Sequence, residues 1–168
     1  MISLSCSVKQ GTEDLLDEGI GISTSHPSYW SYKGENVLLL GGSIEDNLFQ
    51  VPGLEEELKK LRSVGGNYVR NTMSSRDEGN YWPFEKNENG FYDLNRFNED
   101  YWERFSNFLF KTHEYGIFVQ IEIWATFDFY RDNWEVNPFN PNQSTGTTQP
   151  FTLLFRAASM IFMTLAAS

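Results

Sequence analysis

Residues 37–72 read VLLLGGSIEDNLFQVPGLEEELKKLRSVGGNYVRNT, and this stretch decides the fold. It opens with a short apolar run that ends in two glycines (37–42), a pattern typical of a strand buried on both faces. Residues 52–64 carry leucines spaced by four and three, with acidic residues first and basic residues last, which predicts a helix whose charges complement its dipole. Residues 67–72 predict a second strand. Together these elements have the size of one βαβ unit.

The same rhythm repeats further along the chain. Residues 95–115 predict a long amphipathic helix that is capped by Asn95 or Asn98 and closed by Gly116. Residues 117–123 (IFVQIEI) predict a third strand. Strands joined by crossovers of this size predict a parallel sheet with helices outside it. Periodicity alone leaves two architectures open, a closed (β/α)8 barrel, which needs about 250 residues, and an open doubly wound sheet.

The N-terminal flank differs from this region. Residues 22–34 predict a hairpin with a turn at Lys33-Gly34. Residues 1–21 form a lead-in that resembles the remnant of a signal segment, without its basic start or its full apolar stretch. We therefore expect an extracellular, periplasmic or cell-surface location with an incomplete signal segment. Two alternatives for the lead-in are a lipid attachment site at Cys6 and a disordered segment.

The C-terminal flank changes abruptly in composition. All 23 acidic residues lie at or before Glu135, and residues 151–168 are almost entirely apolar. Three interpretations compete for this tail: a core helix of a larger domain, a weak membrane anchor, or sequence from a shifted or mis-joined reading frame, which we favour. Since Arg156 would be costly inside a short span, we do not assign a membrane span. We divide the chain into the lead-in, a folded region (22–142) and an atypical tail (143–168).

Composition excludes several functions for the 168-residue chain. Its formal net charge of −10 argues against nucleic acid, because phosphate contacts need clustered lysines and arginines. The one cysteine and two distant histidines give neither a disulfide framework nor a thiolate or histidine-rich metal site. We therefore expect no cofactor and no metal, and the sequence leaves the oligomeric state open.

Charged side chains follow the predicted strands, at the edge where α/β proteins place their chemistry. Strand alternation puts Gln120, Glu122 and Trp124 on one face of the third strand. Arg70 lies on the second strand, so we expect it to form a buried ion pair with Glu122. That pair is either structural, or one in which Arg70 orients a catalytic carboxylate and keeps it ionised.

The predicted loops are unusually rich in aromatic residues beside polar ones. A sugar ring has apolar CH faces ringed by hydroxyl groups, so exposed aromatic rings next to Asn, Asp and Arg suit a carbohydrate. The alternative is that these loops pack their own aromatics and use their acids for turns and caps. The candidate substrate-binding residues are Glu45, Asp46, Asn71, Arg76, Asp77, Trp82, Trp124, Asp128 and Trp134.

Four phrases carry a resemblance to a known family: YKGENVLLLGGSIEDNLF (32–49), LRSVGGNYVRNTMSSRDEGNYWPF (61–84), YDLNRFNEDYWERFSNFL (92–109) and GIFVQIEIWATFDFYRDNWEVNPFNP (116–141). Over these phrases the chain resembles the N-terminal part of cellulase-like (β/α)8 glycoside hydrolases found in bacterial carbohydrate-degradation loci. A hairpin leading into a strand that ends in G-G-x, and an arginine in the pattern N-x-V-R, are typical of these proteins.

The resemblance implies a partial TIM (β/α)8 barrel, its first three β/α units preceded by a β-hairpin. It implies hydrolysis of O-glycosidic bonds in a polysaccharide or oligosaccharide by two carboxylates, which in this family usually end strands four and seven. This chain contains neither strand. The family arginine corresponds to Arg70, and Asn71, Trp124 and Asp128 match the substrate shelf. We expect this chain to contribute Arg70 and Glu122 to catalysis in the longer enzyme, and to be inactive in isolation. The alternative is a non-catalytic carbohydrate-binding or scaffold module.

Overall fold

The computed structural model describes residues 19–145, apart from 124 and 131. They form two compact units, 19–40 and 41–145, and each is described by itself. Most of the predicted lead-in and the tail from residue 146 onward lie outside the described residues.

The first unit is a small antiparallel sheet. Its strands are β1 (Gly21–Ile22), β2 (Trp30–Tyr32) and β3 (Glu35–Val37), paired in that order. Lys33 and Gly34 join β2 to β3 with φ angles of 51° and 80°. Positive φ at both central residues suits a two-residue hairpin turn, because the turn then matches the twist of the strands. The predicted turn at Lys33-Gly34 is confirmed.

The predicted first strand at 37–42 is wrong. Val37 belongs to the antiparallel β3, and the side chains of Leu38 and Leu40 are 58% and 52% exposed. What remains of the strand among the described residues is a parallel bridge between Gly41 and Tyr68. A strand buried on both faces needs cover on both sides, and within the described residues this apolar run does not receive it.

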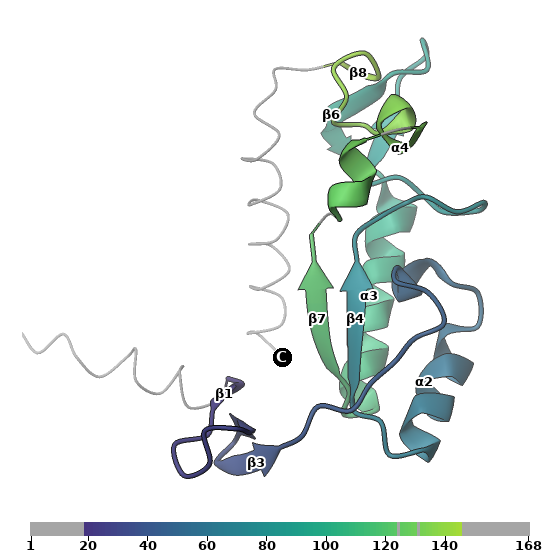
Figure 1. The fold of residues 1–168 in the computed structure, drawn as a ribbon. Coiled ribbons are helices and arrows are strands. Elements are labelled where there is room, and N and C mark those ends of the chain that lie inside the picture. The colour runs from purple at the N-terminus through teal and green to yellow at the C-terminus, as the bar shows by residue number, and fades with distance from the viewer. Residues whose placement is uncertain (1–18, 124, 131, 146–168) are drawn as a thin grey trace, which may run out of the picture. The chain divides into compact units, whose positions relative to one another are not determined.

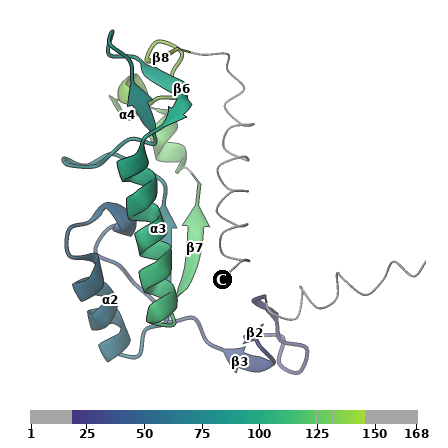
Figure 2. The same cartoon turned by 180° about the vertical axis from the view of Figure 1, so that it is seen from behind.

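The second unit is built on a parallel pair of strands, β4 (Tyr68–Thr72) and β7 (Phe118–Glu122). This pairing confirms the strands predicted at 67–72 and 117–123. Two helices, α2 (Leu54–Ser63) and α3 (Glu99–Glu114), lie along one side of the pair (Figures 1 and 2). Both helices were expected, although α3 begins later than predicted.

The late start of α3 has a local cause. Asn98 caps the helix, since its Oδ1 accepts a hydrogen bond from the backbone N–H of Asp100 at 3.1 Å. The preceding residues are taken up by the strand β6 (Tyr92–Phe97), which pairs with β5 (Phe84–Lys86). Of the two predicted caps, Asn98 is therefore the one used.

The core of the second unit lies between the parallel pair and the two helices. Strand alternation turns Val69 of β4, and Val119 and Ile121 of β7, toward the helices. The aromatic residues of α3 fill the space between, and Phe49 meets two of them edge to face. The buried members of this core are Leu48, Phe49, Leu58, Val69, Met73, Tyr101, Phe105, Phe108 and Ile117.

A second cluster forms beyond the arrowheads of β4 and β7, where Figure 1 shows β6, β8 and α4 gathered together. Its buried residues are Phe84, Tyr92, Leu94 and Phe139, with Trp82 and Trp134 packed against them. The strand β8 (Ser144–Thr145) pairs with β6, so the chain stays packed for three residues past 142, to 145. The helix α4 (Asp132–Val136) lies between β7 and β8 in the chain.

The described sheets contain three, two and three strands. The partial (β/α)8 barrel therefore stays a prediction at this point. Within the part of the chain that the structure describes, no helix is both long and apolar enough to cross a membrane.

Candidate functional site

Three loops meet at the carboxyl ends of β4 and β7, the edge of a parallel sheet that carries chemistry in α/β proteins. The backbone N–H of Thr72 donates to the carbonyl of Asp46 at 2.5 Å, which ties the loop after Gly41 to the end of β4. The N–H of Met73 donates to the carbonyl of Glu122 at 2.9 Å, which holds the two strand ends together. Predicted site residues from three separate segments are therefore brought side by side.

Arg76 is held between two carboxylates from two other loops. Its Nη2 donates to both oxygens of Asp46, and its Nε lies 3.7 Å from Oδ1 of Asp128. Only 18% of the Arg76 side chain is exposed. Burial acts to lower the pKa of Arg76, but Asp46, Asp128 and Asp77 outweigh it and leave that pKa raised. Arg76 is thus a permanent cation that joins all three loops.

Asp128 is a buried carboxylate in the 3-10 helix η2 (Thr126–Phe129), with 4% of the residue exposed. Its Oδ2 accepts a hydrogen bond from Ser74 Oγ at 2.5 Å. Burial raises the pKa of Asp128, and the charge of Arg76 and the Ser74 hydrogen bond offset part of that rise. Its carbonyl accepts from Asn137 Nδ2 at 3.0 Å, so side chain and backbone are both fixed in position.

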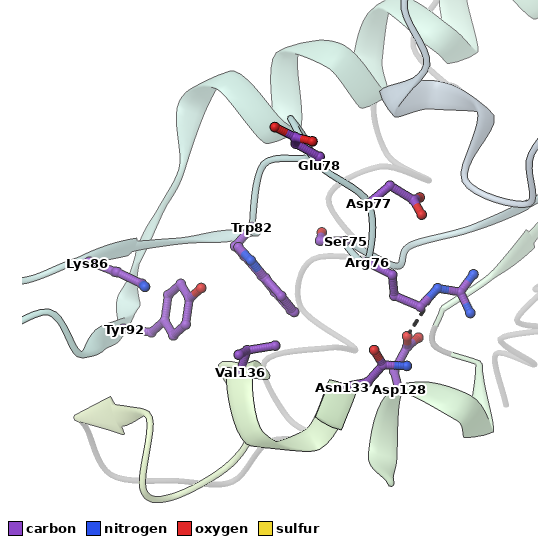
Figure 3. A pocket seen from close by; sticks show the side chains of 10 residues that line it. All are labelled: Ser75, Arg76, Asp77, Glu78, Trp82, Lys86, Tyr92, Asp128, Asn133 and Val136. Atoms are coloured by element: carbon purple, nitrogen blue, oxygen red, sulfur yellow. Dashed lines mark ion pairs between the residues drawn. The ribbon is translucent and has the colours of Figure 1, made fainter. Parts of the chain in front are cut away.

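An open cavity of about 360 Å³ lies beside Arg76 and Asp128 (Figure 3). Its other end is aromatic, where Trp82 and Tyr92 have ring centroids 5.8 Å apart and Lys86 Nζ lies 4.7 Å from the Tyr92 centroid. Burial raises the pKa of Tyr92 to about 12, so its phenol is neutral near pH 7. The lining residues are Ser75, Arg76, Asp77, Glu78, Trp82, Lys86, Tyr92, Asp128, Asn133 and Val136.

Arg70 and Glu122 form the predicted ion pair, but it is not buried. Arg70 Nε donates to Glu122 Oε2 at 2.8 Å, and Nη2 donates to the same oxygen. The side chains are 49% and 32% exposed, because this pair lies on the sheet face opposite the helices, which the described residues leave partly open. The hydrogen bond that Arg70 donates to Glu122 raises the pKa of Arg70, and the charge of Asp46 adds to that rise.

The remaining predicted residues divide into three groups. Asn71 does not line the cavity, and its side chain is fully buried. It accepts a hydrogen bond from the Phe49 N–H at 3.1 Å and donates one to the Thr72 carbonyl. Glu45 and Trp134 do not line the cavity, and Trp134 instead packs against the second aromatic cluster. Trp124 lies outside the described residues.

The structure brings together Arg76, Asp77, Trp82 and Asp128 of the predicted set, and adds lining residues that sequence reasoning missed. Asn133 and Val136 are three residues apart in α4, so both face the cavity. A helical reading of 132–136 would have found them. Ser74 lacked any distinguishing signal in the sequence. Within the residues the structure describes, no three His, Cys, Asp or Glu side chains gather as metal ligands.

Comparisons with known proteins add one finding. No protein-family model matches the chain, and no curated protein matches it. The chain is similar to the crystal structure of a "putative glycoside hydrolase" from Bacteroides vulgatus ATCC 8482, with a TM-score of 0.53 and 17% sequence identity. The match covers 74% of this chain and 27% of that one. The fold of this chain is therefore similar to that of a segment within a considerably longer protein.

Proposed function

We propose that this chain is a carbohydrate-binding portion of a glycoside hydrolase, with its second unit forming part of the wall of a (β/α)8 barrel. Support comes from the parallel pairing of β4 and β7, the helices on one side only, and the loops gathered at the carboxyl ends of the strands. The fold likeness to a protein described as a glycoside hydrolase is in keeping with this assignment.

The observation that carries the proposal is the cavity itself. Trp82 offers a half-buried aromatic surface at one end, and Asp128 and Asn133 offer hydrogen-bonding groups at the other. A sugar ring needs both, since its CH faces stack on an indole while its hydroxyls donate to a carboxylate and accept from an amide. A cavity of about 360 Å³ lies within the range of small-molecule sites, at its lower end.

The open face of the sheet supplies the second part of the proposed site. Arg70 donates twice to Glu122 Oε2, which fixes the direction of that carboxylate. Glycoside hydrolysis uses a pair of carboxylates on either side of the scissile bond. We assign Glu122 and Arg70 to the supporting set of that chemistry in the longer enzyme, and we expect negligible hydrolysis by this chain alone.

Binding to a panel of neutral plant and microbial oligosaccharides, measured by titration calorimetry, tests the proposal. The expected result is binding to at least one member, weakened at least tenfold by Trp82→Ala. Trp134→Ala is the matched control, because Trp134 packs against the same aromatic cluster but does not line the cavity. Equal losses in the two variants, or binding to no member of the panel, would contradict the proposal.

A second candidate is a non-catalytic carbohydrate-binding or scaffold module. It is favoured by the fact that every residue lining the cavity comes from the described second unit. A module of this kind should unfold in one cooperative thermal transition, whereas an incomplete barrel with open sheet edges should not. Steady release of reducing sugar by this chain, abolished by Glu122→Gln, would contradict both the module and our expectation of an inactive chain.

A further inference from the structure

The charges around the cavity are unbalanced. Its ten lining residues include three acids, Asp77, Glu78 and Asp128, against two bases, Arg76 and Lys86. The whole chain carries a formal net charge of −10, which adds to the negative field at this site. A ligand that enters the cavity therefore meets more negative than positive charge.

Arg76 cannot bind an anionic ligand without giving up an ion pair that it already forms. It already donates to both oxygens of Asp46 and lies against Asp128, and these carboxylates come from different loops. A ligand carboxylate that drew Arg76 away would leave Asp128, which is only 4% exposed, without its cation. Leaving a buried carboxylate unpaired is strongly unfavourable, so the pair resists this exchange.

Lys86, the other basic residue of the cavity, would attract an anionic ligand only weakly. Figure 3 shows it at the aromatic end of the cavity beside Tyr92, away from Arg76 and Asp128. Its residue is exposed to solvent, so an ion pair formed there would be screened by water and salt. A neutral sugar meets no such obstacle, because its hydroxyls donate to Asp128 and accept from Asn133 without displacing an ion pair.

We propose that the Asp128–Arg76 pair makes this cavity selective for uncharged sugar rings over sugars that carry a carboxylate. The inference rests on the proposed function and names the substrate class of the same site. Asp128 acts as the specificity-determining residue, because it both hydrogen-bonds hydroxyls and repels a ligand carboxylate. Ser74 positions it through the hydrogen bond to Oδ2. Discrimination of this kind is built from repulsion as much as from attraction.

Matched ligand pairs test the inference. Gluco-, galacto- and manno-configured oligosaccharides are each compared with the uronate oligomer of the same length and linkage, by calorimetry at low salt. In any pair that binds, we expect the neutral member to bind at least tenfold more tightly. Asp128→Asn should reduce the ratio of neutral-sugar to uronate affinity several-fold, mainly by strengthening the binding of the uronate.

Glu78→Gln is the control, since it removes one negative charge from the same cavity at an exposed residue, whereas Asp128 is buried beside Arg76. It should narrow the ratio far less than Asp128→Asn does. A uronate that binds as tightly as its neutral partner, or equal narrowing by the two variants, overturns this inference while leaving sugar binding intact. Absence of binding in all pairs overturns the proposed function as well. If Asp128→Asn does not fold, the ratio in the unchanged protein still decides the matter.

Discussion

Ser74→Ala is the sharpest test of the site, because it removes one oxygen atom from a fully enclosed position. Ser74 is 0% exposed, and its Oγ donates to Asp128 Oδ2 at 2.5 Å. A hydrogen bond to a charged group contributes about 1.5–3 kcal/mol to stability. Since Arg76 still lies 3.7 Å from the other oxygen of Asp128, we expect a loss of about 2 kcal/mol at pH 7.

Urea unfolding measures this loss, and a double-mutant cycle assigns it to the pair. In the Asp128→Asn background the hydrogen bond joins two neutral groups, which is worth only about 1 kcal/mol, so a coupling energy of about 1 kcal/mol should appear. Ser63→Ala is the matched control, because Ser63 Oγ is exposed and donates to the Lys60 carbonyl. Its effect should stay within about 0.5 kcal/mol.

The pH dependence of the Ser74→Ala loss has a defined sign. Burial raises the pKa of Asp128, and the Ser74 hydrogen bond works against that rise, so its removal raises the pKa further. The stability lost in Ser74→Ala is therefore fully present at pH values above the pKa of Asp128 in the folded variant. It shrinks as the pH falls and Asp128 becomes protonated. The reasoning is refuted if the loss is the same at pH 7 and in acid, or if the cycle shows no coupling.

Two further predictions concern the frame around the site. In Gly41→Ala the new Cβ would collide with the Tyr68 carbonyl oxygen, so the parallel bridge must break at a cost of about 1–3 kcal/mol. Faster amide exchange along β4 would reveal this, whereas Gly42→Ala, with nothing within 4 Å of its Cβ, should leave exchange unchanged. Hydrogen bonds led by that from Lys59 hold the pKa of Glu55 at about 2, against 4.5 ordinarily. Its small contribution to stability is thus present above pH 4.5, is lost as the pH falls toward 2, and is weakened by salt because the pair is exposed; an NMR titration of Glu55 with a midpoint near 4.5 would contradict this.

Elements with a complete local pattern could be predicted from the sequence. The leucine spacing of 52–64 and the alternation of IFVQIEI each specify one element, and the structure contains α2 and β7 there. The buried strand at 37–42 was predicted from a continuous apolar run without any such spacing, and that prediction is wrong. A continuous apolar run shows that a segment favours burial. Other segments must pack over it on both faces, and the local sequence does not show whether they do.

Site residues show the same division. Aromatic residues beside Asp and Arg pointed to Trp82, Arg76 and Asp128, all of which line the cavity. Asn71 carried the same polar signal but is fully buried and hydrogen-bonded to backbone groups. Asn71 follows Val69 by two positions on β4, so strand alternation puts it on the face that packs against the helices and not on the cavity side.

The sequence by itself determined β4, β7, α2 and α3, because alternation and spacing act within a few residues. It also placed Arg70 and Glu122 on two strands that are neighbours in the structure. Only the tertiary structure decided that this pair is exposed, that Asp46 and Asp128 share Arg76, and that Ser74 supports Asp128. Those contacts join residues about 30 to 54 positions apart. Their geometry follows from how loops close over the ends of a sheet, which no local pattern encodes.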